Sequence, residues 1–333
     1  MKKPSITDIA KRAGVSIASV SYVLNGREKE KRVGEDAANR IRQAAAELNY
    51  RPSHIARSLR QGSTMTIGLV VPDISNSYFG DMAKAIEEEA FRRGYTVIFG
   101  SSDENPEKSE RLVQTLLDRQ VDGIILAPVE EEETHITDLN ERLPLVLIDR
   151  FIKKAGINYV ALDNHQAAYQ AVEHLAKRGD ERIAFVGYLT EMNHITERYR
   201  GYKEAMAAFN AGFSLTGQVR YSRLDEDIET VLDGFYADPD GLDAIVFATN
   251  TLTVAGLYYF QRKQIRIPEE LAVIGFDGNV AFDFFYSPLT YIKQPIQAIG
   301  KRAVEILLQQ IDGKNQQQHQ LHLLPELIER SST

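Results

Sequence analysis

The chain has 333 residues, of which 43% are hydrophobic, and it contains no cysteine. This length favours more than one domain, and the lack of cysteine excludes disulfides, thiolate metal sites and cysteine nucleophiles. The net charge of −8 is unevenly spread, since residues 1–60 hold 13 Lys and Arg against 6 Asp and Glu, a net of +7, and the remainder carries −15. A basic head on an acidic body favours phosphate binding by the head alone.

The N-terminus has no targeting pattern. Lys2 and Lys3 are followed by polar residues rather than by an apolar stretch, so we expect no secretory signal. The longest apolar runs are about five residues, too short to span a membrane.

The first elements have the pattern of two short helices joined by a tight turn. Ser5 and Asp8 are spaced as in a capping box, and Gly14 can end the first helix in a left-handed conformation. Ser16 can then cap a second helix over Ile17–Leu24. Such a pair places a helix in the major groove of DNA, although an ordinary helical hairpin has the same pattern.

A third helix is expected over Glu35–Leu48, ending before Pro52. Ser53–Arg60 then has the composition of a short, weak helix, followed by a polar linker. Eight residues are too few for a stable isolated helix. We therefore expect either a helix that forms only against DNA and a partner chain, or a simple tether.

From Met65 onward, strands alternate with helices, which predicts doubly wound parallel sheets. The expected strands are 66–71, 95–99, 123–126, 145–148, 160–162, 183–186, 219–221, 244–247 and 272–274. The expected helices are 79–93, 107–119, 165–178, 198–211, 229–236, 252–263 and 296–310. The chain is expected to cross back near 290–294 and to end in one strand over 320–328, giving two similar lobes with a waist near Asp163.

Several segments, in this order and spacing, carry a specific resemblance. They include TDIAKRAGVSIASVSYVLNG, NYRPSHIARSL, GLVVPDISNSYF, IPEELAVIGFD and LPELIERSST. The chain resembles the lactose-repressor (LacI/GalR) family of bacterial transcription regulators over essentially its whole length. The resemblance implies an all-α helix-turn-helix head and an α/β body of two doubly wound parallel-sheet lobes of the periplasmic-binding-protein type.

The resemblance also implies domain boundaries. The helix-turn-helix domain would span 1–52, the hinge helix and linker 53–64, and the effector-binding and dimerisation domain 65–333. In that domain, lobe 1 would comprise about 65–162 plus 292–319, and lobe 2 about 163–291 plus 320–333.

The resemblance implies a set of DNA-contacting residues. Ile17, Ala18 and Tyr22 would take the base-reading positions, and Leu59 would wedge into the minor groove. Phosphate and other DNA contacts would come from Thr7, Ser16, Ser19, Ser21, Asn25, His54 and Arg57. Many family members carry Arg at the position of Tyr22, and Tyr cannot pair bidentately with guanine. We therefore expect weak direct base readout and greater reliance on the hinge and on DNA shape.

A ligand site is expected where the strands of the two lobes end, because open α/β sheets bind ligands at the carboxyl ends of their strands. The candidate residues, which the resemblance also indicates, are Tyr78, Phe79, Asp149, Arg150, His194, Arg198, Asn250 and Asp277. Arg198 is expected to open a helix. Aromatic faces with carboxylate and guanidinium groups suit a sugar, whereas a helix cap or a salt bridge is the alternative for each residue. Thr251 stands where members often have Asp.

These observations predict a cytoplasmic, homodimeric repressor of a carbohydrate-utilisation operon. It would bind a pseudo-palindromic double-stranded DNA operator under the control of a small ligand, a sugar, with no metal, cofactor, membrane or enzymatic role. No leucine heptads precede the end at Thr333, which favours a dimer over a tetramer. The residues leave open which sugar binds, which operator is read, and whether the ligand releases or recruits the protein.

Two other functions fit parts of the sequence pattern. A periplasmic-type sugar-binding protein fits the two lobes but not the basic head or the missing signal. A sugar-modifying enzyme lacks its usual motifs, because no G-x-G-x-x-G follows the first strand and no G-x-x-x-x-G-K-[ST] or G-x-S-x-G occurs.

Overall fold

The computed structural model describes residues 4–50, 62–152, 156–209, 213–313 and 317–333. The chain divides into two compact units, Met1–Thr64 and Met65–Thr333. Within the described residues, no helix is long and apolar enough to span a lipid bilayer.

The first unit is built from three helices, α1 (Ile6–Ala13), α2 (Ile17–Leu24) and α3 (Glu35–Glu47). The predicted capping box is present, because the Ser5 side chain accepts the Asp8 N–H and the Asp8 carboxylate accepts the Ser5 N–H. Gly14 ends α1 with a left-handed φ of 66°, which costs glycine little. The helices enclose a small core, in which the fully buried side chains are Ile9, Val20 and Ile41.

The predicted hinge helix Ser53–Arg60 lies outside the described residues, and so do three predicted DNA contacts, His54, Arg57 and Leu59. They stay predictions.

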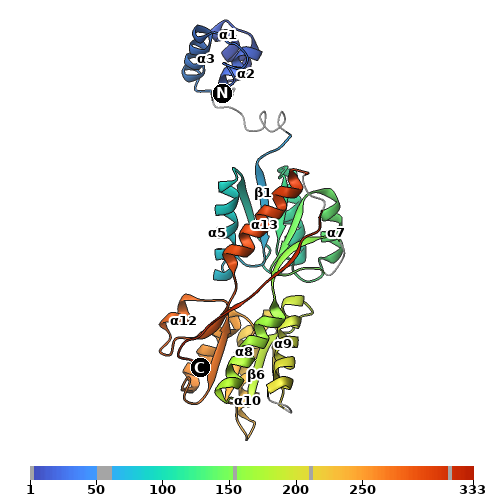
Figure 1. The fold of residues 1–333 in the computed structure, drawn as a ribbon, viewed down its shortest axis with the longest axis vertical. Helices are drawn as coiled ribbons and strands as arrows, with labels where there is room; N and C mark the ends of the chain where they lie inside the picture. Colours follow the sequence, from blue (N-terminus) through green and yellow to red (C-terminus); the bar gives the residue numbers. More distant parts are fainter. Residues whose placement is uncertain (1–3, 51–61, 153–155, 210–212, 314–316) are drawn as a thin grey trace. The chain divides into compact units, whose positions relative to one another are not determined.

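The second unit contains two six-stranded sheets (Figure 1). The strands of the first are β1 (Thr66–Val71), β2 (Thr96–Ser101), β3 (Gly123–Leu126), β4 (Leu145–Ile148), β5 (Asn158–Leu162) and β11 (Gln320–Leu323). The strands of the second are β6 (Ile183–Tyr188), β7 (Leu215–Val219), β8 (Ala244–Phe247), β9 (Ala272–Phe276), β10 (Thr290–Lys293) and β12 (Glu326–Ile328).

The strands of the two sheets follow corresponding orders. The first has the order β11-β5-β4-β3-β1-β2 and the second β12-β10-β9-β8-β6-β7. The described strands pair in parallel, except that the edge strand β12 runs antiparallel to β10. Each strand of one lobe therefore has a counterpart in the other, and β4 corresponds to β9. The predicted fold class is confirmed.

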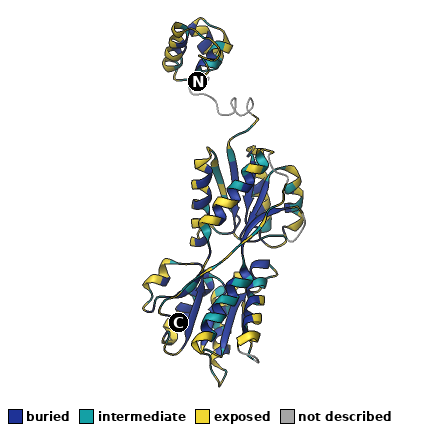
Figure 2. Cartoon of the chain, viewed as in Figure 1, coloured by how far each residue is buried: buried dark blue, intermediate teal, exposed yellow. Residues whose placement is uncertain are grey.

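Helices cover the sheets of both lobes. In the first lobe, α5 (Ser77–Arg92) and α13 (Ile296–Ile311) pack on one face, and α6 (Pro106–Asp118) and α7 (Glu133–Arg142) on the other. In the second lobe, α8 (Asn164–Arg178) packs beside α9 (Asn193–Phe209), and α10 (Leu224–Tyr236) packs beside α11 (Asn250–Lys263). Figure 2 shows the strands as largely buried, with exposed residues on the outer faces of the helices.

In the C-terminal part of the chain, the boundaries of the two lobes differ from those predicted. Thr290–Lys293 was predicted as a crossing, but it forms β10 of the second sheet. The single strand predicted over 320–328 is two strands in different sheets, since β11 pairs with β5 and β12 pairs with β10. Pro325, between them, has no N–H for a sheet ladder, which favours a break there. The chain therefore crosses between the lobes after β5, after β10 and between β11 and β12.

Other local predictions were also wrong. The helix predicted to open at Arg198 starts at Asn193, so Arg198 lies within α9. The strand predicted over 219–221 is β7, which ends at Val219, and a short 3₁₀ helix over Tyr221–Arg223 follows it. The helices α7 and α12 (Val280–Phe284) were not predicted.

Candidate functional site

The surface of α2 carries the predicted base-reading residues. Ile17 has 49% of its surface exposed, Ala18 is exposed, and Tyr22 is half-buried. The Ser16 hydroxyl caps the helix by accepting the Ser19 N–H at 3.1 Å. A short helix with a capped N-terminus and an apolar outer edge therefore faces solvent.

The remaining predicted DNA contacts of this unit lie in α1 and along α2. Thr7 is exposed in the first turn of α1, and Ser19 and Ser21 are half-buried. The Asn25 amide, at the end of α2, donates to the Ser21 carbonyl. Their contact with DNA stays a prediction.

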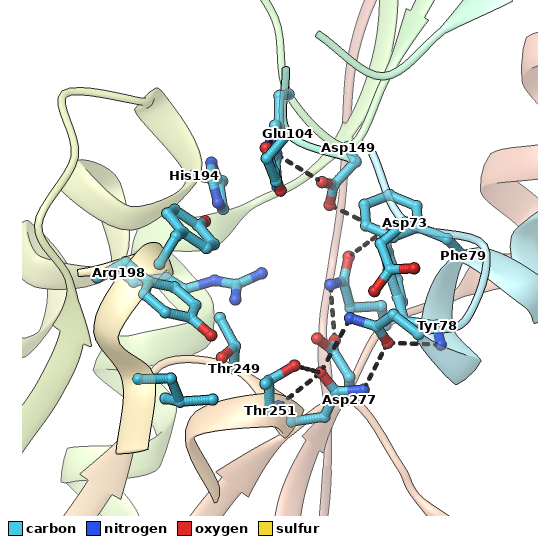
Figure 3. A pocket seen from close by; sticks show the side chains of 17 residues that line it. Asp73, Tyr78, Phe79, Glu104, Asp149, His194, Arg198, Thr249, Thr251 and Asp277 are labelled. Atoms are coloured by element: carbon cyan, nitrogen blue, oxygen red, sulfur yellow. Dashed lines mark hydrogen bonds and ion pairs between the residues drawn. The ribbon is translucent and has the colours of Figure 1, made fainter. Parts of the chain in front are cut away.

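A cavity of about 210 Å³ lies between the two lobes, at the carboxyl ends of the strands (Figure 3). All eight residues predicted for the effector site line this cavity: Tyr78, Phe79, Asp149, Arg150, His194, Arg198, Asn250 and Asp277. The volume is below the roughly 300–1,000 Å³ typical of drug-sized ligands. The structure thus brings these residues together around a space for one small molecule.

Two buried carboxylates occupy equivalent positions in the lobes. Asp149 follows β4 and Asp277 follows β9, and both have a left-handed backbone, with φ of 62° and 57°. Asp adopts this conformation more readily than most residues. Each lobe therefore ends its corresponding strand with a carboxylate at the cavity.

A chain of hydrogen bonds connects the two carboxylates. The Tyr78 hydroxyl lies 2.9 Å from Asp149 Oδ1 and 3.2 Å from Gln294 Oε1, both of which accept from it. The Gln294 amide donates in turn to Asp277 Oδ1 at 2.7 Å. Because Gln294 directly follows β10, the network joins the two lobes at a crossing segment.

Burial makes both carboxylates reluctant to ionise. It raises the pKa of Asp277 to about 6, although the Arg198 charge and the Gln294 hydrogen bond act in the opposite direction. Burial likewise raises the pKa of Asp149, against the charges of Arg150 and Arg198. A ligand that donates hydrogen bonds to these groups would compensate for the water they have lost.

Arg198 is the central cation of the cavity. It is 2% exposed, and its Nε donates to Asn164 Oδ1 at 2.8 Å, while Nη1 donates to the Ala248 carbonyl. Its guanidinium also lies over the Phe276 ring, at 4.3 Å from the centroid. Figure 3 shows this guanidinium directed into the cavity. These contacts hold a planar donor group in one orientation.

Arg150 is engaged by a residue that was not predicted. Its two terminal nitrogens donate to the two carboxylate oxygens of Glu104, each at 2.7 Å. Burial works against ionisation of Arg150, but the hydrogen bonds and charge of Glu104 outweigh it and raise the Arg150 pKa. The pair is a bidentate salt bridge that lines the cavity.

His194 brings an imidazole with a buried, unpaired nitrogen. The side chain is 4% exposed, and its Nδ1 has no hydrogen-bond partner among the described residues. Burial and the neighbouring charges of Arg150 and Arg198 hold its pKa well below 6.5. His194 is therefore a neutral group that can hydrogen-bond a ligand.

Aromatic rings form two walls of the cavity. Phe79 lies on the first lobe, where the Arg150 guanidinium is 6.0 Å from its ring centroid. On the second lobe, Tyr188 and Tyr221 stack at 3.7 Å between centroids, with 16° between their planes. These faces can cover the apolar side of a ligand ring.

Asn250 makes a contact between the lobes rather than only lining the cavity. Its amide donates to Asn76 Oδ1 at 2.8 Å, and its own Oδ1 accepts the Thr251 N–H at 2.8 Å. Asn76 and Asn250 therefore hold the rims of the two lobes together.

Several lining residues were missed from the sequence. They include Asp73, Glu104, Tyr188, Tyr221, Thr249 and Gln294. Applying the strand-end rule to every strand would have found Glu104 after β2, Tyr188 at the end of β6 and Gln294 after β10. Among the described residues, no cluster of three His, Asp or Glu side chains is arranged to hold a metal ion.

Comparison with known proteins gives matches along the whole chain. Residues 5–53 match the model for bacterial regulatory proteins of the lacI family, and residues 64–326 match the model for periplasmic binding proteins and the sugar binding domain of the LacI family. The chain is 34% identical to the ribose operon repressor of Halalkalibacterium halodurans, over 99% of this chain and 97% of that protein.

Two further similarities extend over almost all of the chain. The HTH-type transcriptional repressor PurR of Aliivibrio fischeri is 30% identical over 98% of both proteins. The crystal structure of the lac repressor dimer bound to operator and the anti-inducer ONPF has a TM-score of 0.84 at 21% identity, with 99% of each chain covered. At that identity the structural likeness shows a shared fold.

Proposed function

Since this chain belongs to the LacI family of bacterial regulatory proteins, we propose that it represses a carbohydrate-utilisation operon under the control of a sugar bound between its lobes. Relatives matched over nearly the whole chain are named as repressors. The chain is accordingly a DNA-binding transcription regulator and not an enzyme. Because it acts on DNA, we place it in the cytoplasm.

The observation that carries the sugar proposal is the combination of groups around the cavity. Asp149 and Asp277 are buried acceptors, Arg198 is a fixed donor, and aromatic faces lie on both lobes. A sugar offers adjacent hydroxyls to the first two kinds of group and a C–H face to the third. The match of residues 64–326 to a family of sugar-binding domains supports the same class.

For DNA, we propose that α2 enters the major groove. Ile17 and Ala18 are exposed on its first turn and offer methyl groups, which suit contact with thymine. Tyr22 adds one hydroxyl. Thr7, Ser16, Ser19, Ser21 and Asn25 would position the helix on phosphates, and His54, Arg57 and Leu59 would contact the minor groove.

The angle between the two lobes would couple the binding of the sugar to the binding of DNA. Contacts between the lobes are made by Asn76 with Asn250, and by Asn193, whose amide donates to the Phe151 carbonyl at 2.6 Å. Gln294 lies in a crossing segment and touches both Tyr78 and Asp277. A ligand that contacts both lobes stabilises one angle between them, and we propose that this angle sets the geometry of the hinge segments.

We also propose a homodimer on a pseudo-palindromic operator. Apolar side chains are exposed around α12, where Val280 is 70%, Phe284 83% and Tyr286 65% exposed. Large exposed apolar patches are typical of interaction sites. A second copy of the chain, meeting the same patch across a two-fold axis, would cover it.

Ligand binding to the full-length protein tests the sugar proposal. In a thermal-shift screen of pentoses, hexoses and disaccharides, we expect at least one sugar to raise the melting temperature, because ligand binding to the folded state stabilises it. Guanine is added to the screen to test purines as the alternative class of ligand. Stabilisation by guanine with no response to any sugar would contradict the proposal.

A further inference from the structure

The cavity between the lobes carries more acidic than basic side chains. Its described lining holds four carboxylates, Asp73, Glu104, Asp149 and Asp277, against two guanidinium groups, Arg150 and Arg198. No lysine is present among the described lining residues. The formal charge of the lining is therefore negative before any ligand arrives.

Both guanidinium groups already have partners in the protein, but Arg150 is paired with a carboxylate and Arg198 donates to neutral oxygens. Arg150 forms the bidentate pair with Glu104 and also donates to the Pro128 carbonyl at 3.2 Å. Arg198 donates to Asn164 and Ala248 and lies against Phe276. What remains available to a ligand are in-plane N–H groups of Arg198, which suit hydroxyl oxygens, whereas a phosphate dianion would require compensation by several donors.

Helix N-termini often bind phosphate, but two of those that reach this cavity, at α5 and α11, are capped by side chains. At the start of α5, Asn76 Oδ1 accepts the Tyr78 N–H at 3.1 Å. At the start of α11, Thr249 Oγ1 accepts the Leu252 N–H at 3.2 Å, and Asn250 Oδ1 accepts the Thr251 N–H. These caps occupy backbone donors that an anion would use.

His194 does not add a positive charge. Its burial, together with the charges of Arg150 and Arg198, disfavours protonation and lowers its pKa. Its unpaired Nδ1 can instead form one hydrogen bond with a hydroxyl of the ligand.

From this arrangement we propose that the effector is an uncharged, unphosphorylated sugar and that the cavity rejects the phosphate esters of the same sugar. This inference rests on the proposed function and specifies its ligand class. A phosphate group would be placed among four carboxylates with only Arg198, among the described lining residues, to offset its charge, and juxtaposed like charges at a binding site are strongly unfavourable. The regulator would then sense a sugar before a phosphoryl-transfer reaction consumes it.

Calorimetric titration of the full-length protein with matched pairs tests the proposal. The probes are D-ribose and D-ribose 5-phosphate, D-glucose and D-glucose 6-phosphate, and D-fructose and D-fructose 6-phosphate. In any pair that binds, we expect the phosphate ester to bind at least about 100-fold more weakly than the free sugar.

A charge variant sharpens the test. Glu104→Gln removes one carboxylate and releases Arg150 from its bidentate partner. We expect this variant to reduce the discrimination against the phosphate ester by about tenfold or more. Glu191→Gln removes an exposed carboxylate that does not line the cavity, and it should leave the ratio of the two dissociation constants unchanged.

The outcomes are distinguishable. A phosphate ester that binds as tightly as its free sugar overturns this inference and leaves a sugar-controlled regulator in place. An unchanged ratio in Glu104→Gln also contradicts the charge argument. If neither member of any pair binds and no other sugar does, the proposed function itself fails, and this inference fails with it.

Discussion

The buried carboxyl of Asp277 lowers the stability of the ligand-free protein at neutral pH. It is 7% exposed, and its pKa is about 6 because burial disfavours the charged form. A carboxyl whose pKa is higher in the folded than in the unfolded state stabilises the fold at low pH. That contribution is fully present below about pH 4 and is lost as the pH rises through about 6. At neutral pH the empty site therefore carries a cost that a ligand can offset.

We predict that Asp277→Asn removes this pH dependence. Asn keeps an oxygen for the Gln294 amide but has no charge to bury. The stability of the variant relative to the unmodified protein should therefore increase by about 1 kcal/mol between pH 5 and pH 8. Urea unfolding of the ligand-free proteins measures the difference. The exposed Asp138→Asn serves as control, and a difference that does not change with pH would contradict the account.

Arg198 is predicted to be the main fixed donor to the ligand. Arg198→Lys keeps the charge but loses the planar fork held by Asn164, Ala248 and Phe276. We expect sugar affinity to fall by about 10- to 100-fold, with little change in DNA affinity in the absence of sugar. Arg200→Lys, two residues along the same helix and exposed, is the matched control. Equal losses in the two variants would rule out the assigned role of Arg198.

The sequence indicated some site residues and not others for a physical reason. Asp149 and Asp277 end buried apolar strands, so the strand-end rule alone identifies them. The strand-end rule reaches Glu104 and Gln294 too, but their roles depend on their partners, because Glu104 acts on Arg150 and Gln294 links Tyr78 to Asp277. Side-chain pairs between segments far apart in the chain have no local pattern.

At the scale of elements, the packing of α9 against α8 in the second lobe depends on a glycine. A Cβ on Gly201 of α9 would lie 2.1 Å from the His165 carbonyl oxygen at the start of α8. We predict that Gly201→Ala destabilises the protein by about 1–3 kcal/mol in urea unfolding, since backbone must move. Gly234→Ala in α10, where a Cβ meets nothing within 4 Å, should instead stabilise it by about 0.5–1 kcal/mol. The same sign for both would contradict the packing argument.

The short helix α12 is predicted to take part in dimerisation. Phe284→Asp places a charge in the exposed apolar patch, and we expect the mass measured by light scattering at micromolar concentration to fall from two chains toward one. Leu324→Asp changes an apolar residue that is also exposed, at 71%, and should leave the mass at two chains. A dimer that survives Phe284→Asp would place the interface elsewhere.

Elements with strong local signals were predicted well, and those decided by long-range pairing were not. The buried strands β1, β3, β4 and β8 have the predicted bounds, because continuous apolar runs define them. The C-terminal stretch contains two apolar runs on either side of Pro325, and sequence periodicity does not reveal that each pairs with a different sheet. Amphipathic α7 was missed because its polar residues resemble a loop.

At the scale of the whole molecule, the body is two lobes with corresponding strand orders joined by three crossing segments. The duplicated plan explains why both lobes present a carboxylate with the same strained backbone at the shared cavity. A ligand between them bridges two bodies, so its binding energy depends on their relative angle. That dependence is what a DNA-binding regulator needs for control by a small molecule.

The most direct test measures how strongly the binding of a sugar and the binding of operator DNA affect each other. A labelled operator, selected from random duplex DNA, is titrated with the full-length protein, with and without a saturating sugar whose binding requires Arg198. We predict that the sugar changes the DNA dissociation constant by about 5- to 150-fold, and that saturating operator changes the sugar dissociation constant by the same factor. A sugar that binds through Arg198 but leaves the DNA affinity unchanged would contradict the central claim.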